Sequence, residues 1–281
     1  MIKVAQFTLT ADEAKRLIAY GVCNSELFKD VLINHRILFK GSTTVSALVQ
    51  RALNVPLRIC GRITKNGMKA NKYQSQGAHW LLWDKESVEN VDENVEDIIK
   101  SFNSKDLFIT GANAIDAFGN AALLIGSPGG GGYGKVLGAT YTEGFTTLIL
   151  TTSDKLIPGN IKALYGSVHR KGCDYAYGMA CGLAPIEGEI ITELEAVKLI
   201  ADVEAVIFAR GGVGEAAGAS AIQISGMVDE VEKVLSAVDE IRKEKENLGE
   251  EVSLEECSFP SMGCGHHLSC KFSKKNTIHS L

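Results

Sequence analysis

The chain has 281 residues, of which 45% are hydrophobic, and this is enough apolar material for the core of one large domain or two modest ones. Its 29 basic and 34 acidic residues give a formal net charge of −5, which argues against a general surface for nucleic acid or anionic membranes. Apolar runs stay shorter than a membrane span, and Asp12 and Glu13 come too early for a signal peptide, so we expect a cytoplasmic protein without nucleic-acid or membrane partners.

The first predicted helix covers residues 11–20 and begins with a capping box. Thr10 stands at the cap position and Glu13 follows three residues later. Thr192 and Glu195 repeat this arrangement ahead of a second predicted helix, over residues 193–201. A shared cap explains the likeness of these two helices better than an internal duplication does.

A loop rich in hydroxyl groups follows an apolar run at residues 37–39. Helical spacing of apolar residues over 45–53 predicts a strand, a tight turn and a helix N-terminus. Capping of the helix needs only one hydroxyl group, whereas an anion at the positive end of the helix dipole can use several. The loop residues that we expect to contact such an anion are Gly41, Ser42, Thr43 and Thr44.

The middle of the first half predicts further alternating elements. Residues 58–63 and 80–83 have the composition of strands, and residues 91–102 have the spacing of an amphipathic helix. Strands that alternate with helices predict a parallel sheet.

A second loop region begins where an apolar run over residues 106–110 closes with small residues. A glycine-rich stretch over residues 126–134 follows, and such a stretch carries a high entropic cost unless the main chain approaches something closely. Converging N–H groups attract phosphate or carboxylate oxygens, although a flexible hairpin or a loop against a neighbouring subunit is an alternative interpretation. The residues that we expect at the anion are Thr110, Gly111, Ala112, Asn113, Gly129, Gly130, Gly131 and Gly132.

The order and spacing of these loops over about residues 37–157 resemble the superfamily of ribose-5-phosphate isomerase type A, glucosamine-6-phosphate deaminase and CoA transferases. The 41–43 loop resembles its first phosphate loop, and the 109–116 segment resembles the isomerase's acidic motif. Lys155 falls where these families carry a Ser-Lys pair after a strand. The resemblance implies a Rossmann-like parallel sheet with helices on both faces.

The chain departs from the isomerase at the catalytic acids, because Thr110, Asn113 and Ala114 stand at its acidic motif positions. An aldose-ketose isomerisation needs a base near the substrate carbon, so pentose-phosphate isomerase activity is not expected. Asp116 and Glu143 are the candidate substitutes for the catalytic carboxylates, and Glu143 beside Gly144 superficially resembles the CoA-transferase nucleophile, a glutamate near glycines, without aligning with it. A solvated turn is the alternative interpretation of Glu143, and a surface lysine that of Lys155.

Three parts of the chain are expected. Residues 1–183 form the α/β domain, residues 184–246 a small ferredoxin-like α+β domain, and residues 247–281 a tail. The glycine-rich stretch over residues 211–218 is a ligand loop, a hairpin connection or a subunit contact.

The tail groups thiols and imidazoles, which suit a borderline-soft metal such as zinc. The spacing lacks the Cys-x2-Cys pair that makes a zinc site distinctive, so a reduced tail with incidental cysteines is the alternative. No cofactor is required by the sequence. The candidate ligands are Cys257, Cys264, His266, His267 and Cys270, with Cys173, Cys181 and His169 as more distant sources.

Two functions follow from this pattern. The first is an enzyme of isomerase or CoA-transferase type that binds a small phosphorylated, carboxylated or CoA-linked metabolite with non-standard acid-base residues. The second is a non-catalytic metabolite-binding or regulatory protein with the same pocket. In either case we expect a homo-oligomer.

Overall fold

The computed structural model describes residues 1–70, 77–244 and 268–271. Its largest sheet is mixed, with strand order β12-β10-β7-β2-β5-β6. The first four of these strands are mutually parallel, and β5 runs antiparallel to both of its neighbours. The strands are β2 (Arg36–Lys40), β5 (Trp80–Asp84), β6 (Ser87–Asn90), β7 (Leu107–Gly111), β10 (Thr146–Leu150) and β12 (Glu189–Ile191).

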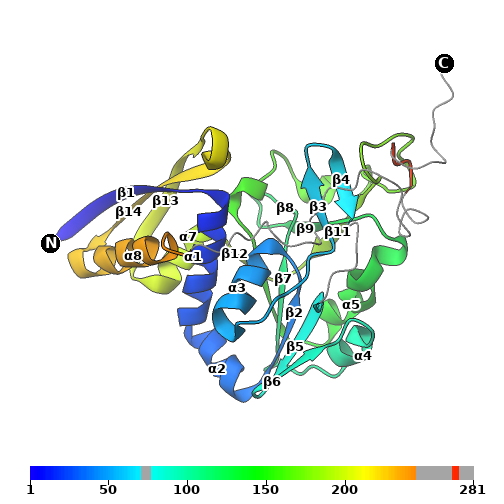
Figure 1. Cartoon of the computed structure of the whole chain (residues 1–281), viewed down its shortest axis with the longest axis horizontal. Helices are drawn as coiled ribbons and strands as arrows, with labels where there is room; N and C mark the ends of the chain where they lie inside the picture. The colour runs from blue at the N-terminus through cyan, green and yellow to red at the C-terminus, as the bar shows by residue number, and fades with distance from the viewer. Residues whose placement is uncertain (71–76, 245–267, 272–281) are drawn as a thin grey trace.

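Helices cover both faces of this sheet because the central strands are apolar on both sides. Ile37 and Phe39 of β2 belong to one core, while Leu38 between them belongs to the other. Figure 1 shows α1 and α3 on one side, with α4 and α5 on the other. These helices are α1 (Ala11–Asn24), α2 (Glu26–Asn34), α3 (Thr43–Leu53), α4 (Val95–Lys100) and α5 (Gly131–Thr142).

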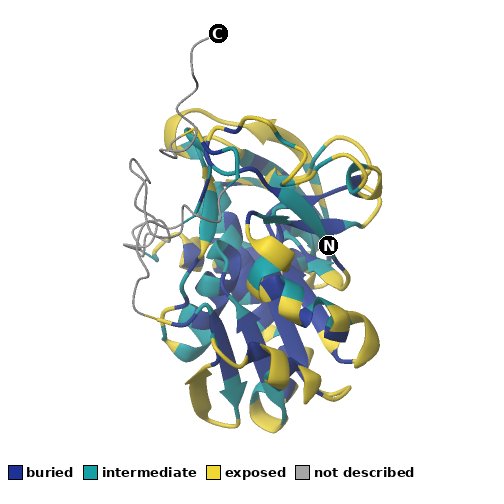
Figure 2. Cartoon of the chain, turned by 90° about the vertical axis from the view of Figure 1, so that its right-hand side faces the viewer, coloured by how far each residue is buried: buried dark blue, intermediate teal, exposed yellow. Residues whose placement is uncertain are grey.

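A second sheet of three antiparallel strands has the order β1-β14-β13. Its strands are β1 (Ile2–Leu9), β13 (Val203–Gly211) and β14 (Ala219–Met227), and the helices beside it are α7 (Glu193–Ile200) and α8 (Val228–Ile241). One face packs on α1, α7 and α8, since Ile222 and Ile224 share a core with Leu17, Val197 and Val234. Figure 2 shows that the strands of the main sheet are mostly buried, whereas exposed residues lie in loops and on the outer surfaces of helices.

Both sheets combine residues from either side of position 183. The N-terminal strand β1 pairs with β14, and β12 joins the main sheet beside β10. Helix α1 packs against α3 and α7, so it contributes to the cores of both sheets. The two predicted domains therefore interleave.

Short elements lie beyond the carboxyl ends of the parallel strands, in the upper part of Figure 1. A hairpin of β3 and β4 and a small sheet of order β11-β9-β8 occupy this region. The elements are β3 (Gly61–Thr64), β4 (Gly67–Ala70), β8 (Ala114–Ile115), β9 (Ala121–Ile125), β11 (Gly182–Ile186), α6 (Ile161–Leu164) and the 3-10 turns η1 (Pro128–Gly130), η2 (Ser153–Lys155) and η3 (Gly214–Ala216).

Several elements differ from their predicted form. The sheet is mixed rather than wholly parallel, because β5 and β6 form a meander at its edge. Much of the glycine-rich stretch is helical: Gly131 to Gly134 form the first turn of α5, which is anchored by the buried side chains of Tyr133 and Val136. The predicted helix over residues 91–102 is confined to α4.

The capping boxes match their prediction. Thr10 accepts a hydrogen bond from the backbone N–H of Glu13, and the Glu13 side chain accepts one from the backbone N–H of Thr10. Thr192 and Glu195 form the equivalent pair at α7.

The stretch over residues 211–218 connects β13 to β14 as a hairpin.

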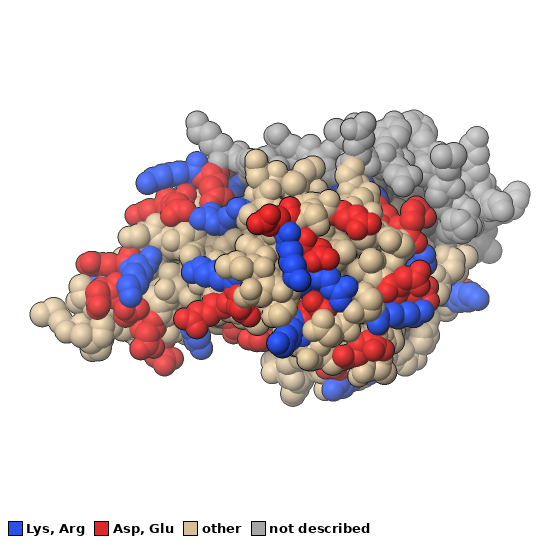
Figure 3. All heavy atoms as spheres, turned by 90° about the horizontal axis from the view of Figure 1, so that it is seen from below, with Lys and Arg blue, Asp and Glu red and all other residues tan. Residues whose placement is uncertain are grey.

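The surface mixes charges of both signs. Figure 3 shows basic and acidic side chains interspersed over the face that it presents, consistent with the small net charge of −5. None of the helices in the part of the chain that the structure describes combines the length and the apolar character needed to cross a membrane.

Candidate anion-binding site

The two predicted loop regions both lie at the carboxyl edge of the main sheet. Ser42 follows β2 and caps α3 by accepting a hydrogen bond from the backbone N–H of Val45 at 3.2 Å. A β-carbon added to Gly111, at the end of β7, would lie 2.4 Å from the Ser42 hydroxyl oxygen. The close approach of Ser42 to the backbone of Gly111 therefore requires glycine at position 111. This contact brings the carboxyl ends of β2 and β7 together.

Lys155 joins this edge from the third parallel strand. It lies in the turn η2 after β10, and its Nζ donates a hydrogen bond to the carbonyl oxygen of Ala112 at 2.9 Å. Burial lowers the pKa of Lys155 to about 8; the nearby charge of Asp154 opposes this shift, and repulsion from Lys15 and Lys40 adds to it. The amine of Lys155 therefore lies near other lysines at the carboxyl edge of the main sheet.

Lys40 connects the first loop with the glycine-rich start of α5. Its Nζ lies 6.0 Å from the centre of the Trp80 ring, and a β-carbon added to Gly132 would lie 2.8 Å from Nε1 of the same tryptophan. Burial lowers the pKa of Lys40 to about 8, with a small opposing contribution from the Cys60 thiol. Trp80 therefore lies near both Lys40, which precedes the first loop, and the glycine-rich start of α5.

Lys40 and Lys155 are the unusual charges of this edge. Each is partly buried, and neither forms an ion pair with any residue in the described part of the chain. Lys15, the third lysine nearby, is paired with Asp12 at 2.7 Å. Buried charges are normally paired, so two partly buried lysines without a carboxylate at ion-pair distance are unusual.

Two hydroxyl groups at the same edge also lack partners among the described residues. The Oγ1 atoms of Thr44, in the first turn of α3, and of Thr151, directly after β10, are buried and form no hydrogen bond with that part of the chain. Buried hydroxyl groups are nearly always hydrogen-bonded. Thr44 is 0% exposed, so its hydroxyl group does not contact bulk solvent.

The glycines of the second loop form an open turn. Gly129, Gly130 and Gly131 all have positive φ, between 59° and 88°. β-Carbons added to Gly129 and Gly130 would meet no atom within 4 Å, and no side chain caps α5. In the described part of the chain, the first N–H groups of α5 have no side-chain cap, and the backbone N–H of Gly131 donates to the carbonyl oxygen of Pro128. Thr43 is partly exposed in the first turn of α3.

Other predicted ligand residues are used by the protein itself. The Thr110 hydroxyl donates to the carbonyl of Gly111 at 3.3 Å, and the Asn113 side-chain oxygen accepts from the backbone N–H of Leu124 at 3.0 Å. The backbone N–H of Asn113 donates to Ala122. Asn113 thus fixes the hairpin of β8 and β9.

Asp116 holds a loop together. Its carboxylate accepts hydrogen bonds from the backbone N–H groups of Phe118, Asn120 and Ile161, at 2.8 to 3.0 Å. Burial acts to raise the pKa of Asp116, but the donors, with Ile161 first, outweigh it and lower the pKa to about 2. A carboxylate so fully hydrogen-bonded is a poor proton acceptor near neutral pH.

Glu143 lies at the other end of the sheet. It follows α5 and precedes β10, so it stands near the amino end of that strand, while Lys155 follows its carboxyl end. Its side chain is exposed and accepts a hydrogen bond from Thr142 at 3.0 Å. The structure does not bring Glu143 to the lysines.

A polar network behind Lys155 joins the two sheets. The Glu193 carboxylate, on a residue that is 1% exposed, accepts hydrogen bonds from the Ser153 backbone N–H at 2.9 Å and the Ser220 hydroxyl at 3.1 Å. It also accepts one from the Ser153 hydroxyl, and Arg210 donates to the Ser153 carbonyl. The turn that carries Lys155 is thereby fixed to α7 and to the small sheet.

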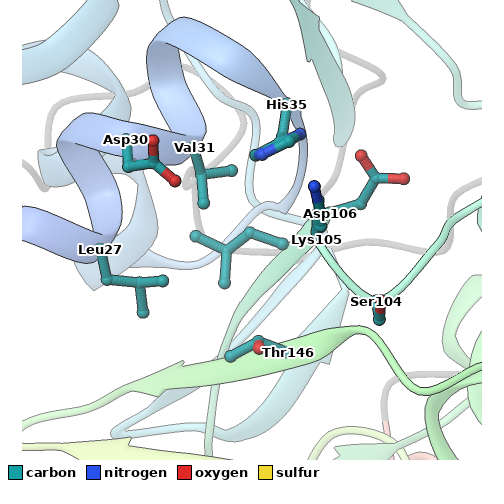
Figure 4. A pocket seen from close by; sticks show the side chains of 9 residues that line it. Leu27, Asp30, Val31, His35, Ser104, Lys105, Asp106 and Thr146 are labelled. Carbon is teal, nitrogen blue, oxygen red and sulfur yellow. The ribbon is translucent and has the colours of Figure 1, made fainter.

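A separate hollow of about 390 Å³ lies at the amino edge of the sheet, between α2 and the starts of β7 and β10. In Figure 4, Leu27 and Val31 of α2 line one wall, and the 104–106 loop and Thr146 lie across from them. Asp106 is neutralised by Arg36 at 2.6 Å. The predicted anion-binding residues take no part in this hollow.

Most of the predicted metal ligands lie outside the residues that the structure describes, namely Cys257, Cys264, His266 and His267. Cys270 is described and buried, and its backbone pairs with Ala176. Ser269 donates to the carbonyl oxygen of Cys173. Within residues 1–70, 77–244 and 268–271, no three His, Cys, Asp or Glu side chains are arranged to hold a metal ion.

Two residues of the edge were not singled out from the sequence. Lys40 ends a buried strand directly before a glycine, and a charged residue at such a strand end is a usable signal. Glu193 carried no distinct signal, because it looks like an ordinary acidic residue in the first turn of a capped helix.

Comparison of the chain with protein-family models, curated proteins and solved structures found no match.

Proposed function

We propose that the chain binds a small anionic metabolite at the carboxyl edge of the main sheet, with Lys40 and Lys155 as its counter-charges. The observation that carries this proposal is the pair of partly buried lysines without an ion-pair partner among the described residues. The N-terminus of α3 and the open start of α5 add backbone N–H groups near the same place.

Electrostatics explains why such an edge suits an anion. The lowered pKa of each lysine means that the protein disfavours the charged amine, and a bound phosphate or carboxylate reverses that preference. The anion also supplies acceptors for the partly exposed hydroxyl group of Thr43 in the first turn of α3. Binding is therefore expected to stabilise the folded chain.

The proposal includes an enzyme of isomerase or CoA-transferase type, with a Rossmann-like main domain and a ferredoxin-like small one. Its acid-base groups must then be non-standard, because Asp116 is saturated with hydrogen bonds and Glu143 lies at the amino edge. The alternative proposal is a metabolite-binding or regulatory protein without turnover. Turnover of a stabilising ligand, followed by mass spectrometry, separates the two.

Isothermal titration with inorganic phosphate, pyrophosphate and citrate tests the proposed site. We expect at least one of these anions to bind, and Lys40→Met or Lys155→Met to weaken it by roughly tenfold or more, since each removes a counter-charge of about 1–3 kcal/mol. Lys135→Met is the matched control, because Lys135 is exposed on α5. Equal affinity in all four proteins contradicts the proposal, as does the absence of binding.

The double variant Ser42→Ala/Thr43→Ala tests the first loop. The loss of both hydroxyl groups should weaken binding of the same anion by roughly tenfold, and an unchanged affinity would show that this loop does not belong to the site.

The metal proposed at the tail is tested by metal analysis of protein purified without an affinity tag. The homo-oligomer and the cytoplasmic location stay predictions.

A further inference from the structure

Lys155 has features that simple anion binding does not require. An arginine or an exposed lysine neutralises a phosphate without burial. Lys155 is instead partly buried at a strand end, with one N–H of its amine held 2.9 Å from the carbonyl oxygen of Ala112. That hydrogen bond orients the amine. The other positions on its nitrogen point away from the Ala112 carbonyl group.

Burial is the main cause that favours the neutral form of Lys155, and the nearby charge of Asp154 opposes it. Lys40 and Lys15 both act on it by charge repulsion, and the described part of the chain offers it no ion pair. A desolvated lysine beside other cations is the usual arrangement for an amine that attacks a carbonyl carbon. Among the described residues, no carboxylate lies at ion-pair distance from the amine, and Asp154 acts on it only from farther away.

We propose that Lys155 forms an imine with an aldehyde or ketone carbonyl of the bound anion, so that the ligand class is a phosphorylated or carboxylated carbonyl compound. In this step the Nζ atom bonds to the carbonyl carbon and the carbonyl becomes a hydroxyl group. One amine hydrogen becomes the hydrogen of that hydroxyl group, which then leaves as water with the other amine hydrogen, giving a C=N bond. No oxidant or reductant takes part.

The inference rests on the proposed anion site, because the anionic group brings the carbonyl to the amine. Lys40 and the N-terminus of α3 remain available for the anionic group when Lys155 reacts. The lowered pKa supports this division, since more of an amine with a pKa of about 8 is neutral at pH 7, before the anion binds, than of an amine with the usual pKa of 10.5.

Reductive trapping tests the inference. The full chain is incubated with dihydroxyacetone phosphate and sodium cyanoborohydride, and peptide mapping compares the rates of adduct formation at Lys155 and at the exposed Lys135. We expect Lys155 to react at least tenfold faster than Lys135, and saturating glycerol 3-phosphate, which has no carbonyl group, to protect it. Lys155→Arg keeps the charge and should remove this adduct, while Lys135→Arg should leave it in place.

The outcomes separate the inference from the function on which it rests. If glycerol 3-phosphate binds in a titration but Lys155 reacts no faster than Lys135, the imine is wrong and the anion site stands. If glycerol 3-phosphate does not bind and Lys155 is not selectively modified, both the imine and the anion site are wrong for phosphate ligands. If Lys155 is modified selectively but glycerol 3-phosphate does not protect it, the amine and the bound anion do not share one site.

Discussion

At the scale of single residues, the main lesson is that a charge without a partner is more informative than a charge in a motif. Lys155 was expected at the site only from a family resemblance and Lys40 was not expected there, and in the structure both are partly buried without an ion pair among the described residues. Asp116 is the opposite case, because its hydrogen bonds to backbone N–H groups explain its presence fully.

Lys40 is expected to destabilise the ligand-free protein. Because folding lowers its pKa from 10.5 to about 8, its unfavourable contribution is complete below pH 8 and disappears as the pH rises towards 10.5. Lys40→Met should therefore raise the free energy of unfolding at pH 7 by about 1–3 kcal/mol, and by less at pH 10. Urea denaturation without phosphate measures this, and a loss of stability at pH 7 would contradict the interpretation.

Asp116 is expected to stabilise the fold above the ordinary carboxyl pKa. Its pKa falls from 3.8 in the unfolded chain to about 2, so its contribution is present above pH 3.8 and is lost as the pH falls towards 2. Asp116→Asn should lower the free energy of unfolding at pH 7 by about 2 kcal/mol and flatten its dependence on pH in that range. Equal pH profiles for the two proteins would show that the hydrogen bonds contribute little.

At the scale of elements, predictions from local sequence succeeded where one signal dominates. The capping boxes at Thr10 and Thr192 were predictable because the cap and its partner are three residues apart. The glycine-rich stretch was not, because glycine has a low helix propensity and tertiary packing of Tyr133 and Val136 decides the conformation. The meander of β5 and β6 depends on pairing with β2, which local patterns do not encode.

The junction of β7 with the start of α3 gives a prediction with a matched control. Gly111→Ala places a β-carbon 2.4 Å from the Ser42 hydroxyl oxygen, so it should cost about 1–3 kcal/mol and disturb anion binding. Gly138→Ala in α5 meets no atom within 4 Å and should stabilise by about 0.5–1 kcal/mol. Thermal denaturation of both variants checks this, and equal effects would show that the contact is loose.

At the scale of the whole molecule, the carboxyl edge is where the two sheets meet. Glu193 of α7 binds Ser153 beside the main sheet and Ser220 of the small sheet, and the hairpin residue Arg210 reaches the same turn. The sequence indicated an α/β protein with a second, smaller unit. It did not indicate that β1 and β12 cross between the units, because strand pairing over such distances leaves no local pattern.

The Glu193 network is expected to couple the sheets. Glu193→Ala leaves buried donors of Ser153 and Ser220 unpaired and opens a cavity, so it should lower the free energy of unfolding by about 2–4 kcal/mol. The matched control Glu232→Ala removes an exposed ion pair with Lys3 and should cost less than about 1 kcal/mol. Urea denaturation compares the two, and similar losses would show that the network contributes no more than a surface pair.

A crystal structure of the full chain soaked with tungstate, an electron-dense oxyanion, tests the central claim most directly. The anion should give an anomalous peak within hydrogen-bonding distance of the Nζ atoms of Lys40 or Lys155, beside the first turn of α3. A peak in the amino-edge hollow near His35 and Lys105 instead, with protein side chains packed between Lys40 and Lys155, would contradict it.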